Sequence, residues 1–346
     1  MKPRYLTKSR FKLALECPTK LYYDGKSEYA NQKIEDTFLL SLAEGGFQVG
    51  ELAKCYFPGG YEIETLDYDE ALRQTNELLK QDHVIIYEAA VRFENLFIRA
   101  DILIKNKKKI ELIEVKAKSY HTSKDGFYNK NGSIAAAWQP YLYDVAFQKH
   151  VVRSAFPNQS VSAYLMMADK KAKCPTDGLN QKFKVVTNDN GRKGVVVSKA
   201  LTTNDLKEEI LIQVNVDECC DIIYQAGFET DDDVISFSDY VNQLADCYMK
   251  DIKIISPPSN TCGGCEYSAT EQERKDGLKS GFIECWKECL GWMDEDFLVP
   301  TVFEIWNFRN KNVYIQAGCI KMADIYEEDI VPKSDNKPGL SASERR

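Results

Sequence analysis

The stretch LFIRADILIKNKKKIELIEVKAK, residues 96–118, contains two apolar runs separated by a lysine-rich segment at residues 106–109. Short apolar runs on either side of a turn predict a β-hairpin. The first run contains Asp101, and a carboxylate is costly to bury unless it is paired or bound to a metal. In the second run, the alternation of a strand places Glu114 and Lys116 on the same face. We therefore expect Asp101, Glu114 and Lys116 to meet.

Two carboxylates beside an ammonium group suit the hydrolysis of phosphodiester bonds. Asp101 and Glu114 would hold Mg²⁺ or Mn²⁺, which take oxygen ligands and leave positions for water and a phosphate oxygen. Lys116 would position or help deprotonate the attacking water and offset the charge that builds up on the phosphate. The alternative is a solvated hairpin in which Glu114 and Lys116 form an ion pair of little energetic value. A chain with 28% charged residues also produces this motif by chance.

Composition sets limits on the class of protein. The 346 residues allow one large domain or two smaller ones, and 44% hydrophobic residues are typical of a globular chain. With no apolar run of membrane-spanning length and no secretion signal, we expect a cytoplasmic protein without a membrane partner. The net charge of −8 argues against general coating of nucleic acid. Residues 1–130 carry 21 Lys and Arg against 20 Asp and Glu. This balance is compatible with a local basic groove near the hairpin that binds nucleic acid.

The 11 cysteines predict metal ligation or burial rather than a disulfide framework. Cys262-Gly-Gly-Cys265 is a turn whose glycines would let two thiolates point at one metal, and Cys285 follows after 19 residues. Three thiolates need a fourth ligand. Cys289 would complete a local zinc site, and Cys17 is the other candidate.

Apolar periodicity and turn residues predict the remaining elements. We expect helices over residues 5–23 with an interruption at Cys17-Pro18, 35–55 with a break at Gly45-Gly46, 67–81, 134–152, 205–227 and 239–250. We expect further strands over residues 84–90, 161–167, 182–187, 194–201, 297–306 and 312–322. Alternating helices and strands place the chain in the α/β class.

The spacing Asp101-x12-Glu114-Val115-Lys116 resembles the core of the PD-(D/E)XK nucleases, with Ala100 in place of the proline. Together with the cysteines, the pattern over about residues 5–290 resembles the RecB-like branch of that superfamily that carries an iron–sulfur cluster. This branch includes AddB-type helicase–nuclease subunits, CRISPR-adaptation exonucleases and a bacterial family of uncharacterised proteins. The resemblance implies a restriction-endonuclease-like core, a central mixed sheet flanked by helices, with a helical insertion and a cysteine-bound metal cluster.

The resemblance also implies an activity and partners. The chain would be an Mg²⁺- or Mn²⁺-dependent deoxyribonuclease, either an exonuclease or a single-strand nuclease. Its substrate would be single-stranded DNA or duplex ends, and a helicase, CRISPR or phage-defence protein would be its partner. The competing hypotheses are a nucleic-acid-binding module with an inactive nuclease site and a zinc-stabilised interaction protein.

Further site residues follow from the same resemblance. The backbone carbonyl of Val115 would bind the metal. Glu51 is the nearest acid for an additional ligand, with a helix-surface glutamate as the alternative interpretation. A glutamine on the next helix would contact the DNA strand near the metals. Gln139-x3-Tyr143 matches that pattern, but the following proline places Gln139 at the helix start. We therefore prefer Gln148 and keep Gln139 and Tyr143 as the fallback.

In the proteins of this branch, one cysteine before the core and three after it bind a [4Fe–4S] cluster. The matching positions are Cys17, Cys262, Cys265 and Cys285. A cluster that joins Cys17 to Cys262 closes a very long loop, so its expected role is structural. Zinc is the alternative metal.

The expected organisation has five segments. They are an N-terminal helical segment with the first cluster cysteine (1–60), a nuclease core (61–170), additional strands and helices (171–256), a cysteine-rich cluster segment (257–292) and a C-terminal extension that serves as a linker (293–346).

Overall fold

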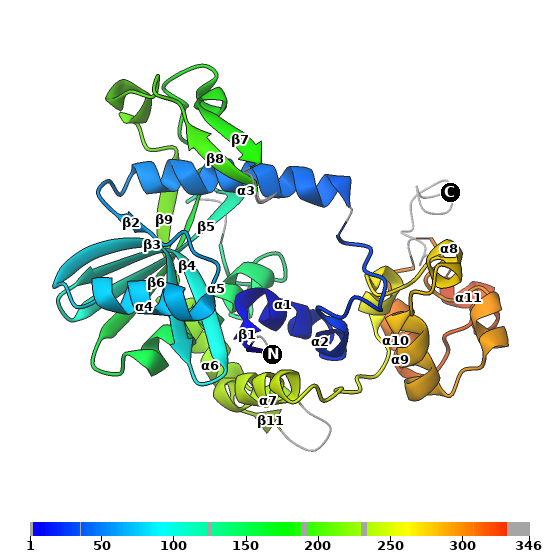
Figure 1. Cartoon of the computed structure of the whole chain (residues 1–346). Coiled ribbons are helices and arrows are strands. Elements are labelled where there is room, and N and C mark those ends of the chain that lie inside the picture. The colour runs from blue at the N-terminus through cyan, green and yellow to red at the C-terminus, as the bar shows by residue number, and fades with distance from the viewer. Residues whose placement is uncertain are drawn as a thin grey trace. The chain divides into compact units, whose positions relative to one another are not determined.

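The computed structural model describes residues 3–34, 36–122, 126–187, 193–229, 234–306 and 308–330 (Figure 1). The chain forms two compact units: the first contains the described parts of Met1–Leu15 and Glu35–Ile252, and the second those of Glu16–Ile34 and Lys253–Arg346. The expected N-terminal segment of residues 1–60 therefore contributes to both units. Within the described residues, no helix has the length and apolar character needed to cross a membrane.

The first unit is built on a seven-stranded mixed sheet flanked by helices, which confirms the α/β class. The strand order is β2 (Tyr61–Glu62), β3 (His83–Phe93), β4 (Leu96–Asn106), β5 (Lys109–Tyr120), β6 (Ser160–Asp169) and β9 (Leu211–Asn215), and β1 (Leu6–Thr7) pairs with β4. The pairs β3–β4, β4–β5 and β6–β9 are antiparallel. The pairs β2–β3, β5–β6 and β1–β4 are parallel.

The predicted hairpin is confirmed as β4 and β5. Asn106 pairs with Lys109 across a two-residue turn. Lys107 in that turn has a φ of 54°, the left-handed conformation that tight two-residue hairpin turns require. The lysine-rich segment therefore forms the tip of the hairpin, and the two apolar runs are central strands of the sheet.

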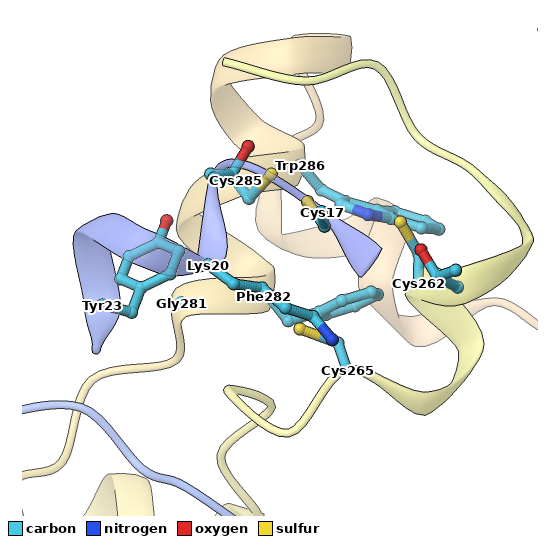
Figure 2. A pocket seen from close by; sticks show the side chains of 11 residues that line it. Cys17, Lys20, Tyr23, Cys262, Cys265, Gly281, Phe282, Cys285 and Trp286 are labelled. Atoms are coloured by element: carbon cyan, nitrogen blue, oxygen red, sulfur yellow. The ribbon is translucent and has the colours of Figure 1, made fainter. Parts of the chain in front are cut away.

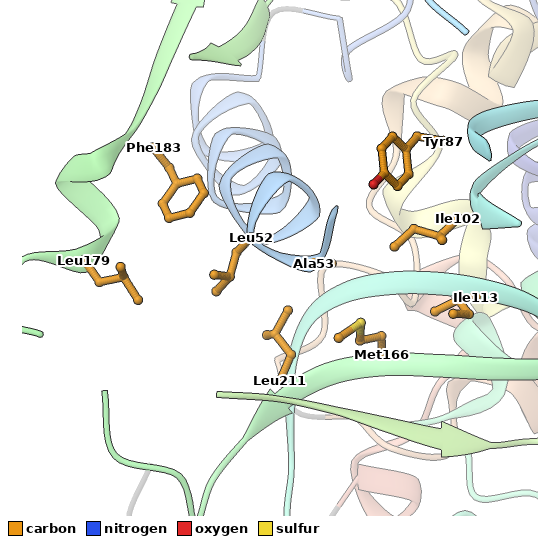
Figure 3. Close-up of a cluster of buried hydrophobic side chains, with 9 residues drawn as sticks. All are labelled: Leu52, Ala53, Tyr87, Ile102, Ile113, Met166, Leu179, Phe183 and Leu211. Atoms are coloured by element: carbon orange, nitrogen blue, oxygen red, sulfur yellow. The ribbon is translucent and has the colours of Figure 1, made fainter. Parts of the chain in front are cut away.

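Helices cover both faces of this sheet. On one face, α3 (Thr37–Cys55) packs Leu52 and Ala53 against a buried cluster that includes Ile102 and Ile113 (Figure 3). On the other face, α5 (Gln139–Ala155) packs against β3, β4 and β6. Because side chains alternate along β5, Ile113 faces α3 and Glu114 faces α5. Glu114 thus lies beneath α5, and the side chain of Gln148 on that helix contacts it.

The remaining elements of the first unit are α1 (Lys8–Glu16), which runs into the second unit at its last residue, α4 (Tyr68–Leu78), η1 (Leu179–Lys182), β7 (Phe183–Thr187), β8 (Lys193–Val197), η2 (Thr203–Leu206), α6 (Asp217–Ala226), β10 (Phe228–Glu229), β11 (Val234–Ile235) and α7 (Phe237–Met249). The hairpin β7–β8 lies beside α3 (Figure 1). The second unit contains α2 (Lys20–Tyr23), η3 (Asn260–Gly264), α8 (Glu271–Lys275), α9 (Gly281–Leu290), η4 (Asp294–Leu298), α10 (Lys311–Gln316), η5 (Met322–Asp324) and α11 (Glu327–Ile330).

Several expected elements differ in the structure. The helix α3 continues through Gly45-Gly46, because its apolar contacts outweigh a cost of about 1 kcal/mol for each glycine. The expected helix over 205–227 is instead η2, strand β9 and α6. The strands expected over 297–306 and 312–322 are wrong. Those residues form η4 and α10 with one isolated bridge, and Pro300 has no N–H for a ladder. The polar end, residues 332–346, lies outside the described residues.

Candidate functional site

The β4–β5 ladder ends at the pair Ile102–Ile113, one step before Asp101 and Glu114 would face each other. Beyond that point the backbone N–H of Val115 donates to Asp101 Oδ2 at 2.8 Å. The Asp101 carboxylate takes the place of the backbone acceptor that a paired β4 would provide, so the Val115 N–H keeps a hydrogen-bond partner. The two strands therefore separate where the two acids stand.

Strand β3 is also irregular beside Asp101. Glu88 has a φ of 54°, which is uncommon for a residue other than glycine. Tyr87 and Ala89 pair with β4 on either side of it, but Glu88 itself does not. Non-glycine residues held in such sparsely populated backbone conformations cluster at functional sites. The sheet is thus distorted on both sides of Asp101.

A lysine from the first turn of α1 enters this opening. Strand β1 pairs with the first residues of β4, whose opposite flank is paired with β3 from Leu96 to Asn106 except at Asp101. β1 therefore lies on the flank that β5 leaves, and α1 begins at Lys8 directly after it. Lys8 Nζ lies 3.1 Å from Asp101 Oδ1 and 3.1 and 3.0 Å from the two oxygens of Glu114. The ammonium group bridges both carboxylates.

On the other side of Glu114, the helix α5 completes a buried polar network. Lys116 Nζ lies 2.5 Å from Glu114 Oε1 and 2.9 Å from Asp144 Oδ2. Gln148 Nε2 donates to Glu114 Oε2 at 2.8 Å and to Asp144 Oδ1 at 3.0 Å. Asp144 and Gln148 are four residues apart, so they project from the same face of the helix. Glu114, Asp144 and Gln148 are each at most 1% exposed.

The ion pairs keep Glu114 and Lys116 charged. Burial alone would raise the pKa of Glu114, but the ammonium groups of Lys116 and Lys8 outweigh it and hold this pKa well below its usual range. Burial alone would lower the pKa of Lys116, but the carboxylates of Glu114 and Asp144 raise it instead. Lys116 is therefore an ammonium group at neutral pH in this arrangement, suited to electrostatic stabilisation rather than to proton removal.

Asp101 is the titratable member of the group. Burial and the neighbouring charge of Glu114 raise its pKa to about 6, although Lys8 and Lys116 act in the opposite direction. With all five side chains ionised, three carboxylates (Asp101, Glu114 and Asp144) and two ammonium groups leave one net negative charge. An additional cation is therefore attracted to the site.

Most of the predicted site residues lie together. Asp101, Glu114 and Lys116 meet as expected, and Gln148 rather than the fallback residues reaches Glu114. Lys8 and Asp144 were not predicted. Asp144 precedes Gln148 by one helical turn in an otherwise apolar segment, and this i, i+4 spacing could have indicated it. No local pattern connects Lys8 with the hairpin.

Three other candidates lie elsewhere. Glu51 is on α3, which covers the opposite face of the sheet, and its carboxylate is 2.7 Å from Lys54 Nζ. Gln139 is the first residue of α5, as its following proline predicts, and is exposed. Tyr143 packs against the ring of Phe228. The structure does not bring these three side chains to Asp101 and Glu114.

The residues around Asp101 and Glu114 fit a divalent cation. Oxygen donors from two carboxylates are the ligand type that Mg²⁺ and Mn²⁺ prefer. The ammonium group of Lys8 already holds a positive charge at three of these oxygens. Gln148 Oε1 is a further buried acceptor without a hydrogen-bond partner among the described residues.

The second unit contains a separate cavity lined by cysteines. Cys17, Cys262, Cys265 and Cys285 surround it together with aromatic rings of Phe282 and Trp286 (Figure 2). Its further lining residues are Thr19, Lys20, Tyr23, Thr261 and Gly281. The four cysteines that the resemblance implied as ligands thus share one site.

The Cys262-Gly-Gly-Cys265 turn packs tightly against the ring of Phe303. A side chain at Gly263 would come within 2.6 Å of the ring of Phe303, so only glycine fits. The N–H of Ser259 donates to Cys262 Sγ at 3.4 Å, and the backbone of Tyr267 donates to Cys265 Sγ. Such bonds to cysteine sulfurs are one way in which proteins tune iron–sulfur clusters.

Burial keeps the thiols of the cavity protonated in the absence of a metal. Burial raises the pKa of Cys265 to about 11, and burial with the neighbouring Cys289 thiol raises that of Cys285 further, so a metal would be needed to form the thiolates. In the part of the chain that the structure describes, no three His, Cys, Asp or Glu side chains are gathered closely enough for one ion.

Cys289 lies outside the cavity lining. Its Sγ is 3.9 Å from Cys285 Sγ and 3.3 Å from the carbonyl oxygen of Ser256. Cys17, in contrast, lines the cavity. Of the two candidates for a fourth ligand, the geometry favours Cys17.

Comparisons with known proteins add no assignment. Neither the protein-family models nor the curated proteins include a match to this chain.

Proposed function

We propose that the chain is a divalent-metal-dependent nuclease of the PD-(D/E)XK type that hydrolyses DNA phosphodiester bonds. The observation that carries this proposal is the convergence of Asp101, Glu114 and Lys116 at the point where β4 and β5 separate. The mixed sheet with helices on both faces is compatible with such a core.

In this proposal the two carboxylates hold the metal. Asp101 and Glu114 supply its oxygen ligands, and the Val115 carbonyl directly follows Glu114 in the chain. A bound Mg²⁺ or Mn²⁺ supplies Lewis acidity and a water of lowered pKa. The Lys116 ammonium stabilises negative charge on the phosphate oxygens in the transition state. Gln148 orients the Glu114 carboxylate, and Asp144 fixes the Lys116 side chain.

The cavity of the second unit would hold a [4Fe–4S] cluster on Cys17, Cys262, Cys265 and Cys285. Cys17 lies in the segment Glu16–Ile34 and the other three lie in the segment that begins at Lys253. A cluster would therefore tie together the two chain segments that form this unit. Its role in the proposal is structural, because metal-bound folds of this kind gain stability from ligation.

The test is a digestion assay with Mn²⁺ on end-labelled single-stranded and duplex DNA. We expect cleavage by the wild type and a loss of at least about 100-fold in Lys116→Met, the effect of removing one transition-state charge contact. Lys54→Met is the matched control, since Lys54 also bridges two carboxylates, those of Glu51 and Glu62. Equal cleavage by Lys116→Met and the wild type would contradict the proposal.

The second candidate function is a nucleic-acid-binding module without catalysis. The position of the Lys8 ammonium favours it, because a lysine can neutralise the two carboxylates permanently in place of a metal. DNA binding in a gel-shift assay, with no cleavage by the wild type in Mn²⁺ or Mg²⁺, would establish this alternative.

A further inference from the structure

Lys8 has the contacts of a cation ligated by oxygen. Its Nζ lies within 3.1 Å of Asp101 Oδ1 and of both oxygens of Glu114. Its position is built into the fold, since β1 pairs with β4 on the flank that β5 leaves and α1 begins at Lys8. The side chain is 24% exposed, so it has a path to solvent.

The other donors at the site do not depend on Lys8. Val115 N–H donates to Asp101 Oδ2, and Lys116 and Gln148 donate to the two oxygens of Glu114. Among the described residues, Lys8 is the one hydrogen-bond donor to Asp101 Oδ1. Removing the ammonium group would therefore leave Glu114 held in place and Asp101 Oδ1 available to a metal.

A divalent cation and the Lys8 ammonium cannot share these oxygens. Mg²⁺ binds carboxylate oxygens at about 2.1 Å. A metal at that distance from Asp101 Oδ1 and Glu114 would be in contact with Nζ, and both groups are positively charged. We propose that Lys8 is an internal counter-ion that competes with the divalent metal, so that metal binding requires its ammonium group to leave the carboxylates. This inference rests on the proposed metal-dependent function.

The first experiment measures Mn²⁺ affinity from the free-ion EPR signal. We expect Lys8→Met to bind Mn²⁺ at least tenfold more tightly than the wild type. Lys8→Arg keeps the charge and should bind no more tightly than the wild type. Lys54→Met should match the wild type, because Lys54 lies on the helix that covers the opposite face of the sheet.

The second experiment uses the wild-type chain and does not depend on a variant that folds. Acetylation of Lys8 by an amine-reactive reagent, followed by peptide mass spectrometry, should accelerate when Mn²⁺ is added, whereas acetylation of Lys54 should not change.

Three outcomes would overturn the inference. Equal or weaker Mn²⁺ binding by a folded Lys8→Met variant would show that Lys8 does not compete. Unchanged labelling of Lys8 in a protein that binds Mn²⁺ would show that the ammonium group stays in place. Absence of Mn²⁺ binding in both the wild type and Lys8→Met would overturn the metal site, and with it the proposed function.

Discussion

Asp144 Oδ2 lies 2.9 Å from Lys116 Nζ, and the buried helix α5 thereby holds the charged end of a side chain that projects from the central sheet. Lys116 and Gln148 each donate to both Asp144 and Glu114, so these two side chains join Asp144 to Glu114. In the proposed site, the role of Asp144 is to position Lys116.

Asp144→Asn tests this positioning role. The substitution removes a negative charge that raises the pKa of Lys116, so that pKa should fall. We expect kcat to decrease by about 10- to 100-fold, the effect typical of residues that support metal-site groups. The alkaline limb of the pH–rate profile should move to lower pH, because the ammonium form is lost earlier. An unshifted profile with reduced activity would indicate a purely structural role.

The pH dependence of metal binding should report Asp101. Its pKa is raised to about 6 by burial and by Glu114, so Asp101 carries a proton below pH 6. Because a metal ligates the carboxylate form, Mn²⁺ affinity should be constant above about pH 7 and fall by about tenfold per pH unit well below 6. Isothermal titration calorimetry of Mn²⁺ binding across this pH range measures this dependence. A break near pH 4, the usual range of an aspartate, would contradict the assignment.

Substitution of single cysteines distinguishes the two candidates for the fourth ligand. After anaerobic purification, the wild type should contain about four iron atoms per chain and show the absorbance of a [4Fe–4S] cluster. Cys17→Ser should lose at least half of the iron, since Cys17 lines the cavity, and Cys289→Ser should keep it. Loss of iron in Cys289→Ser alone would reverse the assignment, and about one zinc per chain would exclude a cluster.

Trp286 has an unused donor at the same cavity. Its side chain is 1% exposed, and its Nε1 has no partner within the described part of the chain. In the view of Figure 2 the indole nitrogen lies between the sulfur atoms of Cys17 and Cys262. A hydrogen bond to a cluster sulfur raises the reduction potential, so Trp286→Phe should lower it and accelerate bleaching in air.

Trp292→Phe is the control for this effect. Trp292 packs edge-on against Trp286 at a ring distance of 4.7 Å but does not line the cavity. Trp292→Phe should leave the reduction potential of the iron-loaded protein unchanged. Equal shifts in both variants would show that packing, rather than the indole N–H, determines the effect.

Local patterns predicted the centre of the fold because their signals lie within one short stretch. The β4–β5 hairpin, with Asp101, Glu114 and Lys116, follows from strand alternation around a lysine-rich turn. The proline after Gln139 correctly placed that residue at the start of α5. The Cys262-Gly-Gly-Cys265 turn carried its own glycine signal, and Gly263 is required by the close approach of Phe303.

Long-range pairing accounts for most of what was not predicted. Lys8 reaches the site only because β1 pairs with β4, and a two-residue strand leaves no periodic signal. Strand β9 lies in a segment for which we expected a helix, because the periodicity of a short apolar run does not distinguish a strand from a helix. The break expected at Gly45-Gly46 failed because tertiary packing of α3 overrides the low helix propensity of glycine.

Anomalous diffraction at the manganese edge, on crystals grown with Mn²⁺, would locate the metal relative to Lys8 directly. We expect a manganese peak bounded by the carboxylates of Asp101 and Glu114, with the Lys8 ammonium displaced from its position within 3.1 Å of both. No peak at this position in crystals equilibrated with saturating Mn²⁺, and a Lys8 side chain that still bridges the two carboxylates, would contradict this expectation.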